Sequence, residues 1–184
     1  MPTKPGPRHY LDALRQSFDD FARKTGGVCT VANGPESAAL EILAQSNDAW
    51  RVILLWRGDE AHPDSEARIV QVPVCRYRLA VIVCARRPLS PDQNMPTMKA
   101  SPAGSVPSLL DLVPSVRAFA LGLVFNPAMY HGGKLFYGGC DAVALQDGTP
   151  LDAYEMTFSF WADIEPPAEE AVTVDIGAFN GEEN

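Results

Sequence analysis

Long apolar runs are missing from this sequence. The longest of them, such as residues 79–85, fall far short of the roughly 20 residues that a membrane-spanning helix needs. Residues 1–7 have no apolar stretch behind their positive charge, unlike a secretory signal peptide. We therefore predict a flexible amino-terminal arm over residues 1–8, no membrane partner, and a chain that stays in the compartment where it is made.

An excess of basic residues is also missing. The chain has 15 lysines and arginines against 23 aspartates and glutamates, a formal net charge of −8. General nucleic-acid binding draws most of its affinity from basic side chains at the phosphates, so this balance argues against that class of protein. The segment from Asp163 to Asn184 contains acids and neither lysine nor arginine, so the rest of the chain is closer to neutral.

Closely spaced cysteines are absent as well. The four cysteines are scattered, and no two of them form a C-x-x-C pair. A disulfide framework is therefore not expected. We predict reduced and mostly buried thiols, because a free cysteine packs as a small hydrophobic residue. The cysteines are Cys29, Cys75, Cys84 and Cys140.

What the sequence does contain is enough apolar material for one domain. Of its 184 residues, 46% are hydrophobic and 21% charged, which is ordinary for a globular protein with a real core. The order of its periodic segments predicts an α+β fold, a small mixed and mainly antiparallel sheet with helices packed on one face. We assign residues 9–165 to this domain and residues 166–184 to an acidic carboxyl-terminal tail with few core residues.

Apolar stripes predict three helices. Residues 9–24 carry apolar side chains at spacings of four, four and three, and a Gly-Gly pair at 26–27 is a stop signal. A shorter helix is predicted over residues 36–45. A third is predicted over residues 108–123, where Pro114 marks either a kink or the true first turn. The first stripe consists of Tyr10, Leu14, Phe18 and Phe21.

Strands are predicted where apolar residues crowd together or alternate. Residues 28–31 form a short candidate, and residues 50–56 a second one that ends in a polar turn over 57–60. Alternation is stronger over residues 74–85, where Pro73 marks a bulge or an edge stretch. One face of that strand holds Tyr77, Leu79, Val81 and Val83, and the other holds Arg76, Arg78 and Ala80.

The last part of the domain predicts a hairpin. Residues 134–145 lead into an Asp-Gly turn at 146–149, and residues 154–160 return as the cleanest strand of the sequence. Its buried face is predicted to be Tyr154, Met156, Phe158 and Phe160. Its other face, which meets solvent or a partner, is predicted to be Glu155, Thr157, Ser159 and Trp161.

Catalytic and phosphate-binding motifs are not found. The sequence has no G-x-x-x-x-G-K-[ST], no G-x-S-x-G and no H-E-x-x-H, and we predict no cofactor. The best metal candidate combines Asp59, Glu60 and His62, with Asp64 or His131 as a further ligand. A solvated loop is the alternative, because the spacing is generic. Cys140 and Asp141 with His131 would make a nucleophile and its base, but nothing in the sequence fixes their proximity.

Two features favour a binding surface. Arg76 and Arg78 share a strand face, with Arg86 and Arg87 just beyond its end. These arginines form either a solvated face or a basic strip that meets an acidic partner. The Pro-rich loop over residues 88–107 is either disordered or a binding arm that orders on assembly. The candidate interface residues are Arg76, Arg78, Arg86, Arg87, Met95, Met98, Lys99 and Trp161.

The order of these segments resembles the tail terminator (tail completion) family of long-tailed bacteriophages and phage-derived particles. The resemblance rests on the strand at 77–85, the loop and the helix at 108–123, followed by residues 135–139, 145–149 and 154–160. It covers most of residues 9–165 as a pattern of elements and includes no diagnostic motif. The acidic tail and the lengthened loop depart from the smaller members of the family.

The resemblance implies a structural protein without an active site. Members form a ring, typically a hexamer, on the head-proximal end of the tail tube, where they stop tube polymerisation and receive the head-completion or connector protein. DNA would pass through the lumen without specific binding, and the chain would reside in the virion after synthesis in the bacterial cytoplasm.

Other functions stay open at this point. The chain could be a different phage neck or tail component or part of a related contractile machine. A small hydrolase or metal enzyme using Asp59, Glu60, His62 and His131 belongs to a different class, as does a monomeric binding module.

Overall fold

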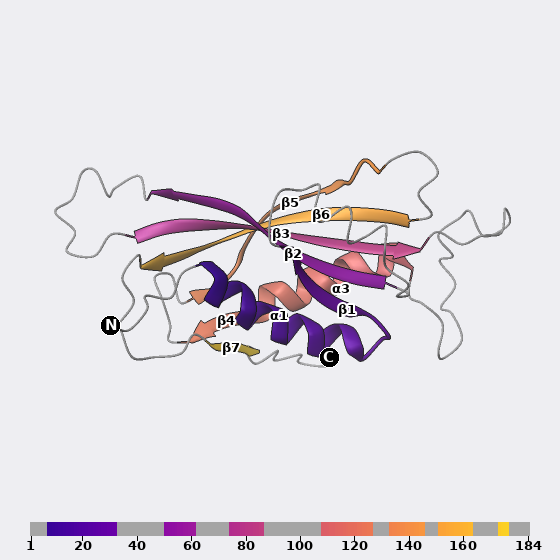
Figure 1. Ribbon diagram of the computed structural model, residues 1–184, viewed down its shortest axis with the longest axis horizontal. Helices are drawn as coiled ribbons and strands as arrows, with labels where there is room; N and C mark the ends of the chain where they lie inside the picture. The colour runs from indigo at the N-terminus through magenta and orange to yellow at the C-terminus, as the bar shows by residue number, and fades with distance from the viewer. Residues whose placement is uncertain are drawn as a thin grey trace, which may run out of the picture.

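The computed structural model describes residues 7–32, 50–61, 74–86, 108–126, 133–145, 151–163 and 173–176. They form an α+β fold with a mixed five-stranded sheet in the order β1-β2-β3-β6-β5 and a two-stranded sheet, β4-β7 (Figure 1). The elements are α1 (Pro7–Arg23), β1 (Val28–Ala32), β2 (Trp50–Ala61), β3 (Val74–Arg86), α3 (Leu109–Gly122), β4 (Leu123–Asn126), β5 (Phe136–Ala142), β6 (Leu151–Asp163) and β7 (Thr173–Ile176).

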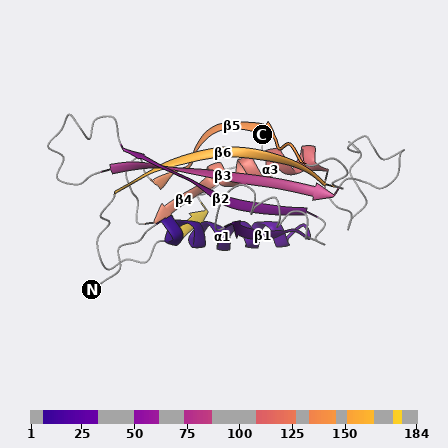
Figure 2. The same ribbon diagram turned by 45° about the horizontal axis from the view of Figure 1, so that its top comes forward.

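The main sheet is mixed and mainly antiparallel, as the sequence predicts. β1 runs parallel to β2, and every other neighbouring pair in this sheet is antiparallel. The longest ladder joins β3 to β6 from Val74↔Asp163 to Arg86↔Leu151. Both helices lie on one side of this sheet (Figures 1 and 2). The predicted fold class is therefore confirmed.

Helix α1 supplies much of the apolar layer between the helices and the sheet. Tyr10, Leu14 and Phe18 are fully buried, because their spacing places them on the face that meets the sheet. Phe21 stacks on Phe119 of α3, which joins the two helices. The helix begins two residues earlier than predicted, at Pro7. Proline is favoured in the first turn of a helix, where its missing N–H has no partner to lose.

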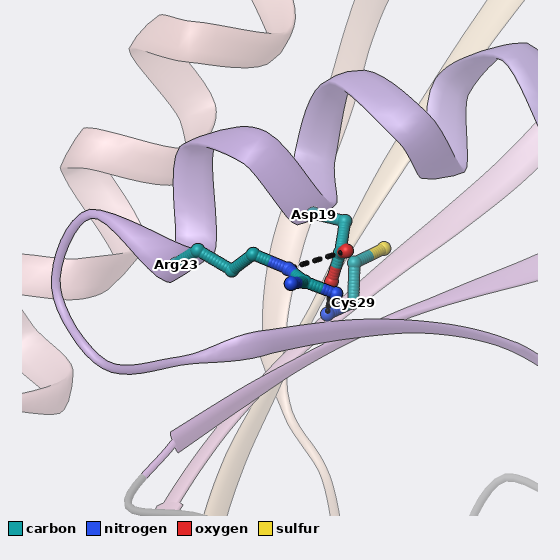
Figure 3. A network of polar contacts seen from close by, with 3 residues as sticks. All are labelled: Asp19, Arg23 and Cys29. Carbon is teal, nitrogen blue, oxygen red and sulfur yellow. Dashed lines mark hydrogen bonds and ion pairs between the residues drawn. The ribbon is translucent and has the colours of Figure 1, made fainter.

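A hydrogen-bond network fixes the end of α1 to the start of β1 (Figure 3). The Asp19 carboxylate accepts from the Cys29 backbone N–H at 3.1 Å and from Arg23 Nε at 2.8 Å. Burial acts to raise the pKa of Asp19, but these two hydrogen bonds and the charges of Arg23 and Arg15 outweigh it and leave the pKa lowered. The charged form of Asp19 therefore stabilises the helix-to-strand connection.

Helix α3 begins at an N-cap and is followed directly by a strand. The Ser108 hydroxyl accepts from the Asp111 backbone N–H at 3.2 Å, so serine satisfies one of the free donors of the first turn. Pro114 lies inside the helix and is exposed, so it does not mark the first turn. The helix passes directly into β4, whose Leu123 and Phe125 are buried.

Strand β7 changes the predicted domain boundary. Residues 166–184 were expected to form a tail outside the domain, yet β7 pairs antiparallel with β4 from Leu123↔Ile176 to Asn126↔Thr173 and packs against α1. The alternation Thr-Val-Asp-Ile is a short strand pattern that the surrounding acids obscure. The folded part of the chain therefore extends beyond residue 165.

The polar segment 57–60 is a bulge inside a strand rather than a turn. β2 continues to Ala61, and its register against β3 shifts between Trp56 and Asp59. Gly58 has a φ of +91°, which glycine adopts without the steric cost that a Cβ imposes. The turn predicted there is wrong, because one glycine with positive φ satisfies a β-bulge as well as a turn.

The outer face of the sheet, opposite the helices, is apolar over half of its length. A second buried cluster there contains Ala32, Ile53, Leu55, Ala80, Ile82, Cys84, Leu151 and Ala153. The sequence assigned Ala80 to the same face as Arg76 and Arg78, which is correct, but did not identify the cluster. The unbroken apolar run in β2 indicated this cluster, because a strand that is buried on both faces does not alternate between apolar and polar residues.

Several predicted segments lie outside the described residues. They are residues 1–6 of the predicted arm over 1–8, the helix over 36–45, the loop over 88–107 and the turn over 146–149; residues 7 and 8 of the predicted arm belong to α1 instead. The strands on both sides of that turn are present as β5 and β6, and they pair antiparallel as expected. Met156, Phe158 and Phe160 are buried, in agreement with the predicted inner face of β6.

Candidate functional site

The other half of the outer face is polar and contains a pocket. We call this surface the arginine pocket, a hollow of about 450 Å³. It lies over β2, β3, β6 and β5, whose alternate side chains point away from the helices. Its lining residues are Arg57, Glu60, Arg76, Arg78, Leu79, Gly138, Glu155, Thr157, Phe158 and Ser159.

An ion pair spans the central strand β3 at the pocket. Arg57 Nη2 on β2 lies 2.5 Å from Glu155 Oε2 on β6, and both strands are neighbours of β3. The two side chains are 31% and 16% exposed, so water screens this pair less than a surface pair. The charges of Arg57 and Glu155 are therefore neutralised within the protein.

A second pair lies at the end of the pocket. Arg76 Nη1 lies 3.1 Å from Glu60 Oε1, and the Arg76 guanidinium sits 5.8 Å from the centroid of the Trp161 ring. The register explains this grouping, because β3 places Arg76 opposite both Glu60 on β2 and Trp161 on β6. Arg76 is thus held by one acid and one aromatic ring.

Arg78 is the remaining charge in the pocket. It is exposed and lies opposite Ser159 on β6. Within the part of the chain that the structure describes, no carboxylate forms an ion pair with it. The described lining residues include three arginines and two glutamates, so Arg78 is one positive charge in excess among them.

The sequence identified part of this site. Arg76, Arg78 and Trp161 were predicted as interface residues, and the structure brings all three to one surface. Arg86 is the last residue of β3, at the opposite end of the strand from Arg76. It therefore belongs to the strand rather than following it. Arg87, Met95, Met98 and Lys99 lie outside the described residues.

Sequence reasoning missed Arg57 and Glu155. They are 98 residues apart in the chain, and only the sheet order brings them together. Neither residue was distinguished in the sequence, since Arg57 lay in a predicted turn and Glu155 was one of several polar residues on β6. A correct reading of β2 as a strand with a bulge would have placed Arg57 on a sheet face.

The predicted metal candidate is not assembled by the residues that are described. Asp59 lies opposite Tyr77 and Glu60 opposite Arg76, so these neighbours occupy different faces of β2. His62, Asp64 and His131 lie outside the described residues. Among those that are described, no three His, Cys, Asp or Glu side chains form a group that could hold a metal ion.

Cys140 and Asp141 are on β5, where the sequence placed a possible nucleophile. Cys140 is half-buried, and burial together with the charge of Asp141 raises the pKa of its thiol, although Arg117 opposes this. A raised pKa lowers the fraction of reactive thiolate at neutral pH. The proposed base, His131, lies outside the described residues.

No protein-family model matches this chain, and no curated protein matches it either. None of the described helices is both long and apolar enough to cross a membrane. The proposals below therefore depend on the chain's own sequence and structure.

Proposed function

We propose that this chain is a structural assembly protein of the tail terminator type. In this role it forms a ring, with six copies as the expected number, on the head-proximal end of a phage tail tube. The ring ends tube growth and receives the head-completion or connector protein. Its final location is the virion.

The element order supports this proposal. The chain has an opening helix, a mixed sheet with helices on one side and a late antiparallel strand pair, β5 and β6. These are the elements that the resemblance to the terminator family implies. The net charge of −8 is compatible with a DNA conduit, because an acidic wall repels phosphates and lets DNA pass.

The observation that carries the proposal is the exposure of β5. None of its seven residues is buried, and Phe136 and Tyr137 are 41% and 38% exposed. β5 is an edge strand, and in the described part of the chain its outer side has no neighbouring strand. An edge strand with exposed aromatic residues is a template for pairing with another chain. In a closed ring each copy would cover this edge of the next copy.

The mass of the purified protein tests this proposal. Light scattering over rising concentration should show a ring, or a monomer that becomes a ring when tail tubes of its own particle are added. Negative-stain microscopy should then show the ring capping one end of each tube. A chain that stays monomeric and ignores the tubes would favour a monomeric binding module and would overturn the proposal.

A substitution on β5 tests the carrying observation. Phe136→Lys places a charge on the exposed edge, and lysine is a residue that natural edge strands use to prevent pairing. We expect this variant to fold, because Phe136 is exposed, but to lose ring formation. Leu121→Lys is the matched control, since Leu121 is 44% exposed but lies on α3. Equal ring formation by the two variants would show that β5 is not part of the interface.

A further inference from the structure

The arginine pocket contains one positive charge that no carboxylate among the described residues neutralises. Arg57 is paired with Glu155, and Arg76 with Glu60, whereas Arg78 has no carboxylate partner among the described residues. A guanidinium forms its strongest hydrogen bonds with carboxylate or phosphate groups, which it binds through two parallel N–H donors. The pocket therefore has room and charge for one additional anionic group.

The surroundings of Arg78 suit a carboxylate. Ser159 lies opposite Arg78 on β6, and Thr157 is the next residue of β6 on the same face, so two residues with hydroxyl groups line the pocket together with Arg78. On the β5 side the rim is Gly138, whose position leaves no space for a side chain because a Cβ would lie 2.8 Å from Thr157 Oγ1. Arg78, Ser159, Thr157 and Gly138 thus all line the same pocket.

The chain itself contains an acidic segment of the required kind. Residues 177–184 follow β7 and include Glu182 and Glu183 but no lysine or arginine. β7 packs against α1, on the helix side of the sheet (Figure 1). The residues that line the arginine pocket include Arg76 and Arg78, on the outer face. In a ring, a segment that leaves from the helix side of one copy can meet the outer face of a neighbouring copy.

We propose that the arginine pocket receives residues 177–184 of a second copy, with Arg78 pairing the carboxylate of Glu182 or Glu183. This contact is heterologous, because two different faces meet, and heterologous contacts close into rings when the rotation permits. The inference rests on the proposed ring function and adds to it the direction of assembly. Arg78, which has no carboxylate partner among the described residues, and the acidic segment are complementary halves of one contact.

A peptide-binding measurement tests the contact directly. A fluorescent peptide with the sequence of residues 177–184 is titrated with the full-length chain, and anisotropy reports binding. We expect Arg78→Gln to weaken binding by about tenfold or more, the loss expected for a charge-assisted hydrogen bond. Arg15→Gln is the matched control, since it removes the same charge from an exposed position on α1. A peptide with both glutamates replaced by glutamine should bind no better than the Arg78→Gln variant binds the original peptide.

Two results would overturn the inference. One is the absence of binding to the unmodified chain, and the other is equal binding by the Arg78→Gln and Arg15→Gln variants. The pocket contact and the ring function can fail independently of each other. Rings that form equally well with Arg78→Gln, and without peptide binding, would refute the pocket contact and leave the ring intact. Arg78-dependent peptide binding by a chain that never caps tubes would support the contact and refute the terminator role.

Discussion

Asp19 shows how one carboxylate can fix a helix to a strand. Its pKa is lowered because the Cys29 N–H and Arg23 stabilise its charged form in spite of burial. A carboxylate with a lowered folded-state pKa adds stability above its unfolded-state pKa, near 3.8, and loses it as the pH falls through the folded-state value. The contribution is therefore complete at neutral pH and disappears in acid.

Asp19→Asn should lower the free energy of unfolding at pH 7 by about 0.5–1.5 kcal/mol, because the amide still accepts from Cys29 but lacks the charge. Urea unfolding at several pH values measures this difference, which should shrink below about pH 4. Asp20→Asn, at an exposed position of the same helix, should have little effect at any pH. A constant difference between the Asp19 variant and the unmodified chain across pH would contradict the role of the charge.

Gly27 marks a close approach between the α1–β1 connection and β2. A Cβ at this position would lie 2.3 Å from Trp50 Cε2, a buried ring whose Nε1 donates to the Thr25 carbonyl oxygen at 3.1 Å. Gly27→Ala should therefore destabilise the fold by about 1–3 kcal/mol, the usual cost of overpacking. Thermal unfolding measures the loss. Gly122→Ala is the control, because a Cβ there meets no atom within 4 Å, and its melting temperature should not fall.

At the scale of elements, the Arg57–Glu155 pair connects β2 to β6 across β3. Breaking one side of a partly buried pair leaves the other charge without compensation, so Glu155→Ala should cost about 1–3 kcal/mol. A double-mutant cycle with Arg57→Ala should show a coupling of at least about 0.5 kcal/mol, measured by urea unfolding. The Glu60–Arg76 pair is about equally exposed on both sides, at 44% and 42%, and should show a smaller coupling. Additive losses at Arg57 and Glu155 would show that the pair is not coupled.

The main elements were accessible from sequence because their apolar periods are regular. The stripe of α1 and the alternation in β3 and β6 follow directly from the geometry of helix and strand. The bulge in β2 could not be predicted from the sequence, because Gly58 is equally compatible with a turn. β7 could not be predicted either, because its four residues are too few to show a periodic pattern and owe their strand conformation to pairing with β4.

At the scale of the molecule, the described core has two layers, and each layer contains at least one buried cysteine. Cys29 and Cys75 belong to the layer beneath the helices, Cys84 belongs to the outer cluster, and all three are buried. Burial, with a contribution from the Asp19 charge, raises the pKa of Cys29 to about 12. The thiolate is the reactive form, so these thiols should react only when the fold opens.

We expect a disulfide reagent at neutral pH to modify Cys140 first and slowly, with a rate that increases with pH because the pKa of this thiol is raised. The other three should react together at the rate of unfolding, and all four promptly in urea. Cys140→Ser should remove the first phase. Prompt reaction of two or more thiols in native buffer would contradict the burial of both layers.

The candidate site was less accessible from sequence than the fold. Alternation along β3 placed Arg76 and Arg78 on one face, and alternation along β6 placed Trp161 on the matching face. Which of the arginines is neutralised depends on Glu60 and Glu155, and these partners are set by strand order and register. Local sequence patterns do not reveal strand order or register, because long-range strand pairing is decided by the packing of the whole sheet.

The division of the outer face into an apolar half and a charged half has a consequence for how the chain selects its native alignment. A slip of β6 by two residues against β3 keeps every side chain on its own face, so hydrophobic burial beneath the helices penalises it only weakly. In one direction, however, such a slip would move Glu155 from Ile82 to Cys84, further along the apolar cluster and away from its partner Arg57. An ionised group placed there is costly unless a partner follows it. The pair of Arg57 and Glu155 on the outer face therefore disfavours this misalignment of β6 against β3.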